Sequence, residues 1–111
     1  ERNGTRYLLL NEGQGIHSVY HPDQVTTNGT WDYFTIAPFF NAPPYEANRV
    51  KRLAIVGLAG GSIARLYTEL YGPLPIDGVE IDPKIADAIA EANGVAAGDL
   101  VPGQTLAIPS R

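Results

Sequence analysis

The sequence has no cysteine and no methionine, and it contains a single tryptophan. Without cysteine the chain can form neither a disulfide framework nor a thiolate zinc site, and cysteine catalysis is excluded. No apolar run approaches the roughly 20 residues that a membrane-spanning helix needs, and no signal peptide opens the chain. Because methionine is absent, we expect a piece of a longer protein, and we expect it to be cytoplasmic.

Basic residues are also few, and their distribution is uneven. The first 52 residues carry five acidic and five basic side chains, whereas the remaining 59 carry seven and three, for a formal net charge of −4. No basic face is available, which argues against a nucleic-acid partner. With 44% hydrophobic and 18% charged residues in 111 positions, the composition indicates one globular domain at most.

A strand, a glycine turn, a helix and a second strand are predicted between Arg52 and Pro83. The short apolar run at 53–56 is typical of a buried parallel strand, and the glycine-rich stretch 57–61 turns the chain into a helix. That helix is predicted by apolar residues at helical spacing: Ile63, Leu66, Tyr67, Leu70 and Tyr71. Gly72 and Pro73 then end it, and a second strand at 76–81 follows.

Such a unit is typical of a nucleotide-binding α/β fold. Glycines allow close approach of a ligand to the helix N-terminus, and a carboxylate at the tip of the next strand accepts hydrogen bonds from a ribose. Glu80 lies nineteen residues after Gly61. We therefore predict a small-molecule nucleoside site formed by Gly57, Gly60, Gly61, Glu80 and Asp82. The alternative is that the glycines only form a tight turn, that Glu80 is solvated and that Asp82 caps a helix.

The flanking segments also have recognisable patterns. Strand-like runs at 6–10 and 16–20 surround a turn-rich pentapeptide, which predicts a β-hairpin. Thr30 is expected to cap a short helix that Pro38 kinks or ends. After Glu80, Asp82 and Pro83 are expected to start another helix with Ile85, Ala86, Ile89 and Ala92 on its apolar side, before a stop at Asn93 and Gly94 and a last strand at 104–108.

Other polar and aromatic residues have simpler interpretations. His17 and His21 are predicted to be surface or turn residues rather than metal ligands, so no metal site is expected. Asp32 is interpreted as a first-turn helix carboxylate rather than a catalyst. The aromatic cluster is interpreted as core or interface, because no basic residue lies among its members, Trp31, Tyr33, Phe34, Phe39 and Phe40.

Several short motifs together resemble the spermidine synthase family of polyamine aminopropyltransferases. They are Tyr-Leu-Leu-Leu-Asn-Glu-Gly at 7–13, His-Ser-Val-Tyr at 17–20, Trp-Asp-Tyr-Phe at 31–34, Val-Gly-Leu-Ala-Gly-Gly from 56, and Asp-Gly-Val-Glu-Ile-Asp-Pro at 77–83. The resemblance implies a subunit-packing hairpin followed by a methyltransferase-like domain for decarboxylated S-adenosylmethionine or methylthioadenosine. It also implies an amine acceptor, a possible polyamine, and a parent activity of aminopropyl transfer.

Three departures from that family predict that the isolated chain is inactive. Gly60 stands where members have an aspartate facing the aminopropyl donor, and 35–37 reads Thr-Ile-Ala instead of Tyr-His-Glu. The family's catalytic aspartate lies beyond the matching region, so no catalytic residue is assigned and a base for the attacking amine is missing. A further hypothesis is therefore that the chain is an inactive fragment that binds a nucleoside or packs against another subunit.

From about Ile85 onward the chain resembles a different family. Ile-Ala-Glu-Ala-Asn-Gly-Val and the later Pro-Gly-Gln-Thr-Leu-Ala-Ile-Pro resemble the second half of a LysM module, which implies a non-catalytic module binding peptidoglycan or chitin. The front half of such a module is missing. Either two fragments are fused, or the tail supplies a helix and a third strand to the α/β sheet.

These interpretations combine into one predicted organisation. Residues 1–48 are expected to form the β-hairpin and short helix, and 49–111 a truncated methyltransferase-like, Rossmann-type β-α-β-α-β unit with a LysM-like tail at 85–111. So short a sheet leaves an edge unpaired, and the hairpin carries more apolar side chains than two strands can bury. We therefore expect a homo-oligomer.

Overall fold

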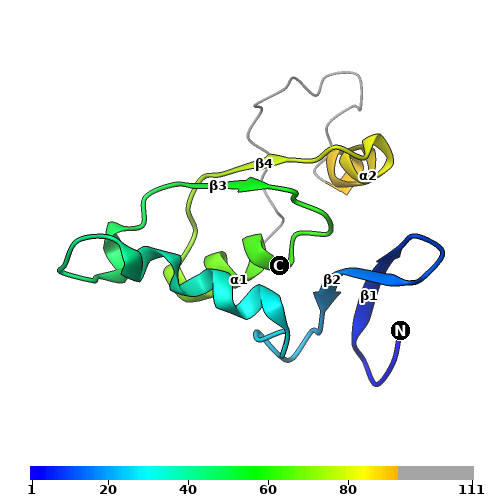
Figure 1. Cartoon of the computed structure of the whole chain (residues 1–111), viewed down its shortest axis with the longest axis horizontal. Helices are drawn as coiled ribbons and strands as arrows, with labels where there is room; N and C mark the ends of the chain where they lie inside the picture. The colour runs from blue at the N-terminus through cyan, green and yellow to red at the C-terminus, as the bar shows by residue number, and fades with distance from the viewer. Residues whose placement is uncertain (93–111) are drawn as a thin grey trace.

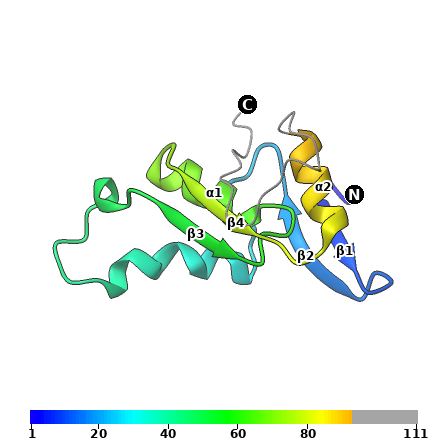
Figure 2. The same ribbon diagram turned by 90° about the horizontal axis from the view of Figure 1, so that it is seen from above.

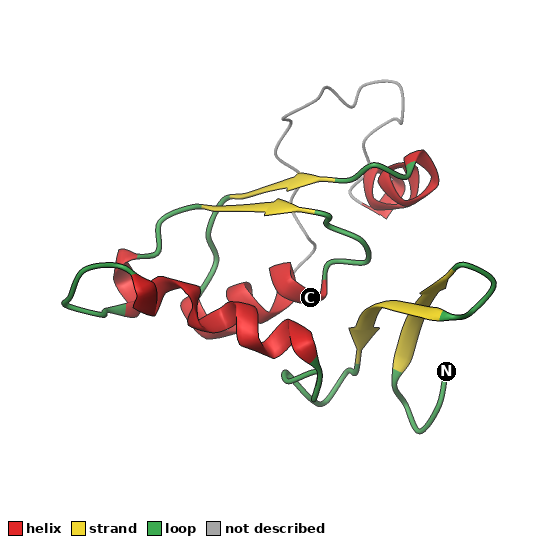
Figure 3. Cartoon of the chain, in the orientation of Figure 1, coloured by secondary structure: helices red, strands yellow, loops and turns green. Residues whose placement is uncertain are grey.

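The computed structural model describes residues 1–92, which form a small mixed α/β domain with two separate two-stranded sheets (Figure 1). The elements follow in the order β1 (Arg6–Leu10), β2 (Gly15–Tyr20), η1 (Thr30–Phe40), η2 (Ala47–Arg49), β3 (Leu53–Val56), α1 (Ser62–Tyr71), β4 (Ile76–Val79) and α2 (Pro83–Ala92). Figure 3 distinguishes the helices from the strands. Within this range, the helices are too short or too polar to span a membrane.

The N-terminal β-hairpin is confirmed. β1 and β2 pair in antiparallel orientation, with a bulge between Leu8 and Leu9. The connecting turn uses left-handed backbone at Asn11, Glu12 and Gly13, with φ of 53°, 58° and 85°. Glycine and asparagine tolerate this conformation better than most residues, which explains why this pentapeptide forms the turn.

The helix after Thr30 differs from the prediction in its type and in its cap. η1 is a 3-10 helix that begins after Gly29, and the Thr30 side chain does not cap it. Pro38 lies inside η1, which continues to Phe40, so of the two predicted effects of Pro38 the stop is wrong, and the kink stays a prediction. Asp32 lies in the first turn of η1, as predicted. Its carboxylate accepts hydrogen bonds from the preceding loop, namely from the Thr27 backbone N–H, the Thr27 hydroxyl and the Asn28 N–H at 2.7–2.9 Å.

The central strand, turn, helix and strand are also confirmed. β3 and β4 pair in parallel, with Leu53 opposite Ile76 and Val56 opposite Val79, and Figure 2 shows them side by side. The core cluster consists of Ile55, Leu58, Ala64 and Ile76, with the partly buried Leu53, Ile63, Leu74 and Ile89 packed against it. Since its members come from both strands, the turn and both helices, this cluster holds the glycine turn in place.

The apolar stripe of α1 is only partly buried. Leu66 and Tyr67 are buried at 1% and 3% exposure, but Leu70 is 54% exposed. The Tyr67 and Tyr71 hydroxyls donate hydrogen bonds to the backbone carbonyls of Phe34 and Thr35 on η1. α1 therefore packs against η1 as well as the sheet, while Leu70 stays exposed.

α2 begins as the sequence predicts. Asp82 precedes Pro83 at the start of α2, and its carboxylate accepts a hydrogen bond of 2.9 Å from the Lys84 backbone N–H. Ile85, Ala86 and Ile89 are partly buried. The predicted stop at Asn93 and Gly94, the strand at 104–108 and most of the LysM-like tail lie outside the described residues.

The α/β class is thus confirmed, while the finer architecture is not. The second strand ends at Val79, two residues earlier than predicted, so Glu80 follows the strand instead of lying within it. The described part of the chain contains two separate two-stranded sheets, so a methyltransferase-like, Rossmann-type arrangement is not confirmed.

Candidate functional site

The turn between β3 and α1 lies where the parallel strands β3 and β4 end. Figure 1 shows both strands pointing toward the side of the molecule that carries the hairpin and α2. Gly57 and Gly61 have φ of 85° and 83°, and Ala59 has φ of 47°. Three left-handed residues in five produce the sharp reversal, and Gly61 becomes the N-cap of α1. Gly57 and Gly61 thus allow the backbone conformation that the turn requires.

The Glu80 carboxylate closes this turn from the side of β4. Its Oε2 accepts a hydrogen bond of 2.7 Å from the Ala59 N–H, and its Oε1 accepts bonds of 2.8 and 3.0 Å from the N–H groups of Ile81 and Asp82. A carboxylate offers about four lone-pair sites. Three are occupied within the chain, and one on Oε2 can still accept a donor from a ligand.

These hydrogen bonds control the charge of Glu80. Burial by itself would raise the pKa of its carboxyl, but the N–H groups of Asp82, Ala59 and Ile81 outweigh this effect and hold the pKa below its usual value. The nearby negative charge of Asp82 acts in the opposite direction. Glu80 is therefore ionised near neutral pH, and it serves as a hydrogen-bond acceptor rather than a proton donor.

The N-terminal hairpin docks on the other side of the same turn, a contact that the sequence did not predict. The Gly60 N–H donates to the Ser18 hydroxyl oxygen at 2.7 Å, and a Cβ on Gly60 would lie only 2.9 Å from the Ser18 Cβ. Ser62 extends the contact, because its hydroxyl accepts from the Val19 N–H at 2.8 Å and donates to the Val19 carbonyl. Gly60 is thus required for close approach of β2.

Arg65 strengthens this docking. Its guanidinium donates to the His21 carbonyl at 2.7 Å and lies 4.5 Å from the centre of the Tyr20 ring. No sequence motif marked these contacts. The only available signal was the small size of Ser18 and Ser62 beside apolar neighbours, which is too common to be specific.

The structure therefore brings the five predicted site residues together, although their roles differ. Gly57, Gly60 and Gly61 shape the turn, and Glu80 spans from β4 to it. Asp82 caps α2 and donates its backbone N–H to Glu80, which agrees with the alternative interpretation of this residue. Ligand contacts of all five remain predictions.

Histidine and carboxylate side chains do not gather elsewhere. Across residues 1–92 there is no group of three or more that could hold a metal ion. The His21 Nδ1 accepts a hydrogen bond from the Asp23 N–H at 3.1 Å, which is a turn contact. The carboxylates of Asp32 and Glu80 each accept three hydrogen bonds from within the chain, and a ligand contact of Glu80 stays a prediction.

Acidification is expected to destabilise the fold through Glu80 and Asp32. For Asp32, burial would raise the pKa, but the Thr27, Asn28 and Gly29 hydrogen bonds lower it on balance. A carboxylate with a lowered pKa stabilises the fold fully above its unfolded pKa, about 4.3 for Glu and 3.9 for Asp. That stabilisation is lost as pH falls through the lower folded value.

Urea unfolding at pH 7, 5 and 3.5 measures this effect. The double variant Asp32→Asn, Glu80→Gln is expected to be less stable at pH 7 and to show a shallower loss toward pH 3.5 than the parent chain. Glu69→Gln, which removes one exposed carboxylate from α1, is the control. Parallel pH dependence in the parent and the double variant would contradict the assignment.

Comparisons with known proteins give relatives over about half of the chain. Residues of this chain are 46% identical over 59 positions to the aspartate carbamoyltransferase catalytic subunit of Synechococcus sp. (strain WH7803), covering 51% of this chain and 16% of that protein. They are 42% identical over 59 positions to the subunit of the same name from Prochlorococcus marinus (strain MIT 9303), covering 51% and 15%. No family model and no solved structure matches.

These relatives overturn the resemblance to spermidine synthases. The assignment to aminopropyl transfer and polyamine biosynthesis is wrong, because the matching proteins carry the name of a different transferase. The glycan-binding alternative and the inactive nucleoside-binding fragment gain no support from them either. Short motifs such as the glycine turn encode a strand, a turn and a helix, and unrelated proteins share such units.

The chain spans about one sixth of the length of the relatives that it matches.

Proposed function

We propose that the chain is a segment of a larger transferase related to aspartate carbamoyltransferase catalytic subunits. The observation that carries the proposal is the 46% identity over 59 positions, with a second relative of the same name at 42%. Because the match covers about one sixth of those proteins, the proposal assigns to this chain a part of a substrate site, and the complete reaction to a longer protein.

The glycine turn is the part of the described structure best suited to contact a substrate. In open α/β sheets, ligands bind outside the carboxyl ends of the strands, and the turn lies at the ends of β3 and β4. At this turn, Glu80 Oε2 keeps one lone pair that accepts no hydrogen bond from Ala59. In carbamoyl transfer to aspartate, the accepting group is an amine, which is a hydrogen-bond donor.

In this proposal Glu80 orients the amine of aspartate. The lowered pKa of its carboxyl makes Glu80 a weak base, so it positions the amine and does not deprotonate it. The base and the donor site for the carbamoyl group would belong to other parts of the longer protein. Binding of one substrate at the turn is thus separable from turnover.

A nucleoside, such as methylthioadenosine or decarboxylated S-adenosylmethionine, is the second candidate ligand. The observation that favours it is the position of Glu80 at the end of β4, beside a turn with two left-handed glycines. One free acceptor site admits one ribose hydroxyl, whereas a bidentate contact requires the Ala59 hydrogen bond to open. Because this hydrogen bond would have to break, the nucleoside is a weaker candidate than aspartate.

Titration of the ¹⁵N-labelled chain with L-aspartate tests the proposal. The amide resonances of 59–61 and 80–82 are expected to shift, and Glu80→Gln is expected to weaken binding about tenfold or more, since a hydrogen bond to a charged group contributes about 1.5–3 kcal/mol. Glu69→Gln is the matched control, because it removes the same charge from an exposed site on α1.

The outcomes separate the candidates. Shifts that are equally large in Glu80→Gln would show that the turn is not the site. Shifts with 5′-methylthioadenosine and none with L-aspartate would favour the nucleoside. With carbamoyl phosphate and aspartate together, the isolated chain is expected to form no carbamoylaspartate, and measurable product would show that it contains a complete active site.

A further inference from the structure

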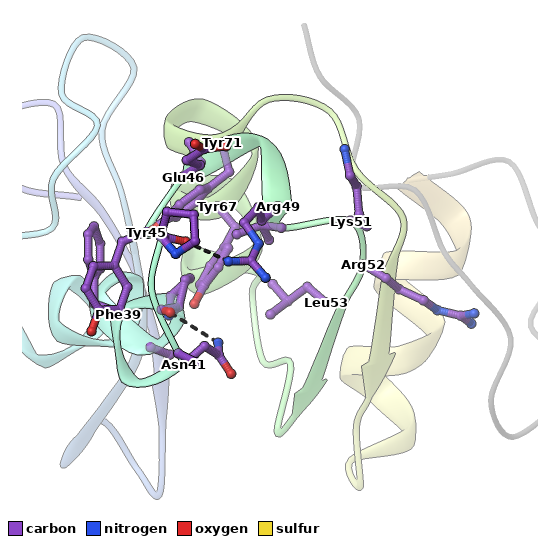
Figure 4. A pocket seen from close by; sticks show the side chains of 16 residues that line it. Phe39, Asn41, Tyr45, Glu46, Arg49, Lys51, Arg52, Leu53, Tyr67 and Tyr71 are labelled. Atoms are coloured by element: carbon purple, nitrogen blue, oxygen red, sulfur yellow. Dashed lines mark hydrogen bonds between the residues drawn. The ribbon is translucent and has the colours of Figure 1, made fainter.

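A pocket lies at the opposite end of β3 from the glycine turn. It has a volume of about 640 Å³ and is lined by the end of η1, the connection from 41 to 52, the first residue of β3 and two tyrosines of α1. This volume falls within the range of about 300–1,000 Å³ for small-molecule sites. Figure 4 shows the lining side chains. The pocket is thus separate from the turn and independent of the function proposed for it.

Aromatic rings form one wall of this pocket. Tyr67 and Tyr71 stack with ring centres 5.0 Å apart, and Phe39 and Tyr45 lie 5.7 Å apart. The hydroxyls of Tyr67 and Tyr71 donate to backbone carbonyls of η1. Their protons are therefore committed within the chain, and what this wall offers a ligand is mainly the flat apolar surface of the rings.

The polar part of the pocket is basic. Three cationic residues line it against one acid, Glu46. Arg52 is engaged elsewhere, because its Nε lies 2.6 Å from Asp77, and Figure 4 shows its side chain pointing away from the pocket. In the same view Arg49 lies among the pocket side chains, whereas Lys51 lies to one side of them. Arg49 is therefore the cation best placed to meet a ligand.

One hydrogen bond orients the Arg49 guanidinium. Its Nη1 donates to the Pro44 carbonyl at 2.8 Å, while a guanidinium carries five N–H donors in a rigid, planar arrangement. This leaves donors for a bidentate contact with a carboxylate or a phosphate. A held arginine beside stacked aromatic rings is suited to a molecule that joins an oxyanion to a flat apolar body.

We propose that this pocket binds a small aromatic or otherwise planar molecule that carries a carboxylate or phosphate group. Arg49 binds the oxyanion, and the apolar body packs against the exposed rings of Phe39 and Tyr45, behind which the buried Tyr67 supports the pocket. The ligand meets a site of net positive charge on a chain whose overall charge is negative. Binding at this pocket requires neither Glu80 nor the glycine turn.

Titrations of the full chain with four probes test each part of this proposal. Benzoate and phenyl phosphate are expected to bind with dissociation constants of roughly 1 mM or tighter, an affinity within the range of binding energy per atom that small ligands reach. They are also expected to shift the amide resonances of 45–53. The tighter of the two identifies the oxyanion. Benzamide has the ring without the charge, and inorganic phosphate has the charge without the ring, so both are expected to bind at least tenfold more weakly.

Variants of Arg49 provide the second test. Arg49→Ala is expected to weaken binding of the tighter probe about tenfold or more, and Arg49→Lys to restore part of it, because lysine keeps the charge and loses the bidentate geometry. Lys84→Ala is the matched control, since it removes one exposed cation from α2. The amide spectrum of each variant shows whether the fold is retained.

Three results would overturn the proposal. The first is that neither benzoate nor phenyl phosphate binds to the parent chain. The second is that benzamide binds as tightly as benzoate, which would leave no role for the charge. The third is that inorganic phosphate binds as tightly as phenyl phosphate, which would leave no role for the aromatic wall. The comparison of probes on the parent chain stays decisive even if Arg49→Ala does not fold.

Discussion

Leu66→Ala is expected to lower the free energy of unfolding by about 2–5 kcal/mol, the range for Leu→Ala changes in protein cores. Leu66 is the largest side chain within residues 1–92 that is less than 2% exposed. Removing three carbon atoms from this position on α1 loses both their burial and their contacts with neighbouring atoms. A domain of this size has few buried side chains to compensate, so one cavity can remove much of the total stability.

Urea unfolding at pH 7 measures this loss, and Leu70→Ala is its control. Leu70 lies one turn later on α1 and is 54% exposed, so the same chemical change there is expected to cost under about 1 kcal/mol. Equal losses in the two variants would mean that Leu66 is not part of a packed core. Weak ordering of the parent chain would appear in the same experiment as a broad, non-cooperative transition.

Gly61→Val is expected to produce the second large effect, on both stability and the ligand site. Gly61 has φ of 83° at the N-cap of α1 and is buried. A β-branched residue in left-handed backbone is strained, and such strain costs about 1–3 kcal/mol. The strained turn is expected to move the Ala59 N–H away from Glu80, so L-aspartate binding at the turn should weaken with stability.

Gly61→Asn separates backbone strain from the bulk of the new side chain. Asparagine enters left-handed backbone more readily than valine, so Gly61→Asn is expected to be more stable than Gly61→Val. Thermal melting of both variants beside the parent chain measures the difference. If asparagine and valine destabilise equally, side-chain crowding explains the loss and the backbone argument is wrong.

Much of the local structure could be predicted because its causes are local. The hairpin turn, the strand at 53–56 and the Asp82 cap each depend on neighbouring residues with known backbone preferences. η1 could not be predicted in the same way. The sequence pattern indicates a helix here, but η1 is of the 3-10 type, and its hydrogen bonds from α1 come from tyrosine hydroxyls 33 and 36 positions away. Helical periodicity alone does not reveal such contacts.

The candidate site shows the same division. Spacing along the chain indicated that Glu80 would lie near the glycine turn, and the structure confirms this proximity. The Glu80 carboxylate accepts hydrogen bonds from three backbone N–H groups, and the one from Ala59 depends on how β4 lies relative to the turn. The family assignment failed for a related reason, because motifs that encode a turn carry little information about the reaction. The predicted homo-oligomer stays a prediction.

Residue types and short-range sterics were enough to predict the order of the strands and helices within 1–92, apart from η2, and the sharp glycine turn at 57–61. The lack of cysteine was enough to exclude cysteine chemistry. Only the tertiary structure placed Ser18 against Gly60, 42 positions away, and gathered Arg49 with the rings of η1 and α1 into one pocket. Such contacts join distant segments, and their geometry depends on how whole elements pack. No local pattern encodes that packing by itself.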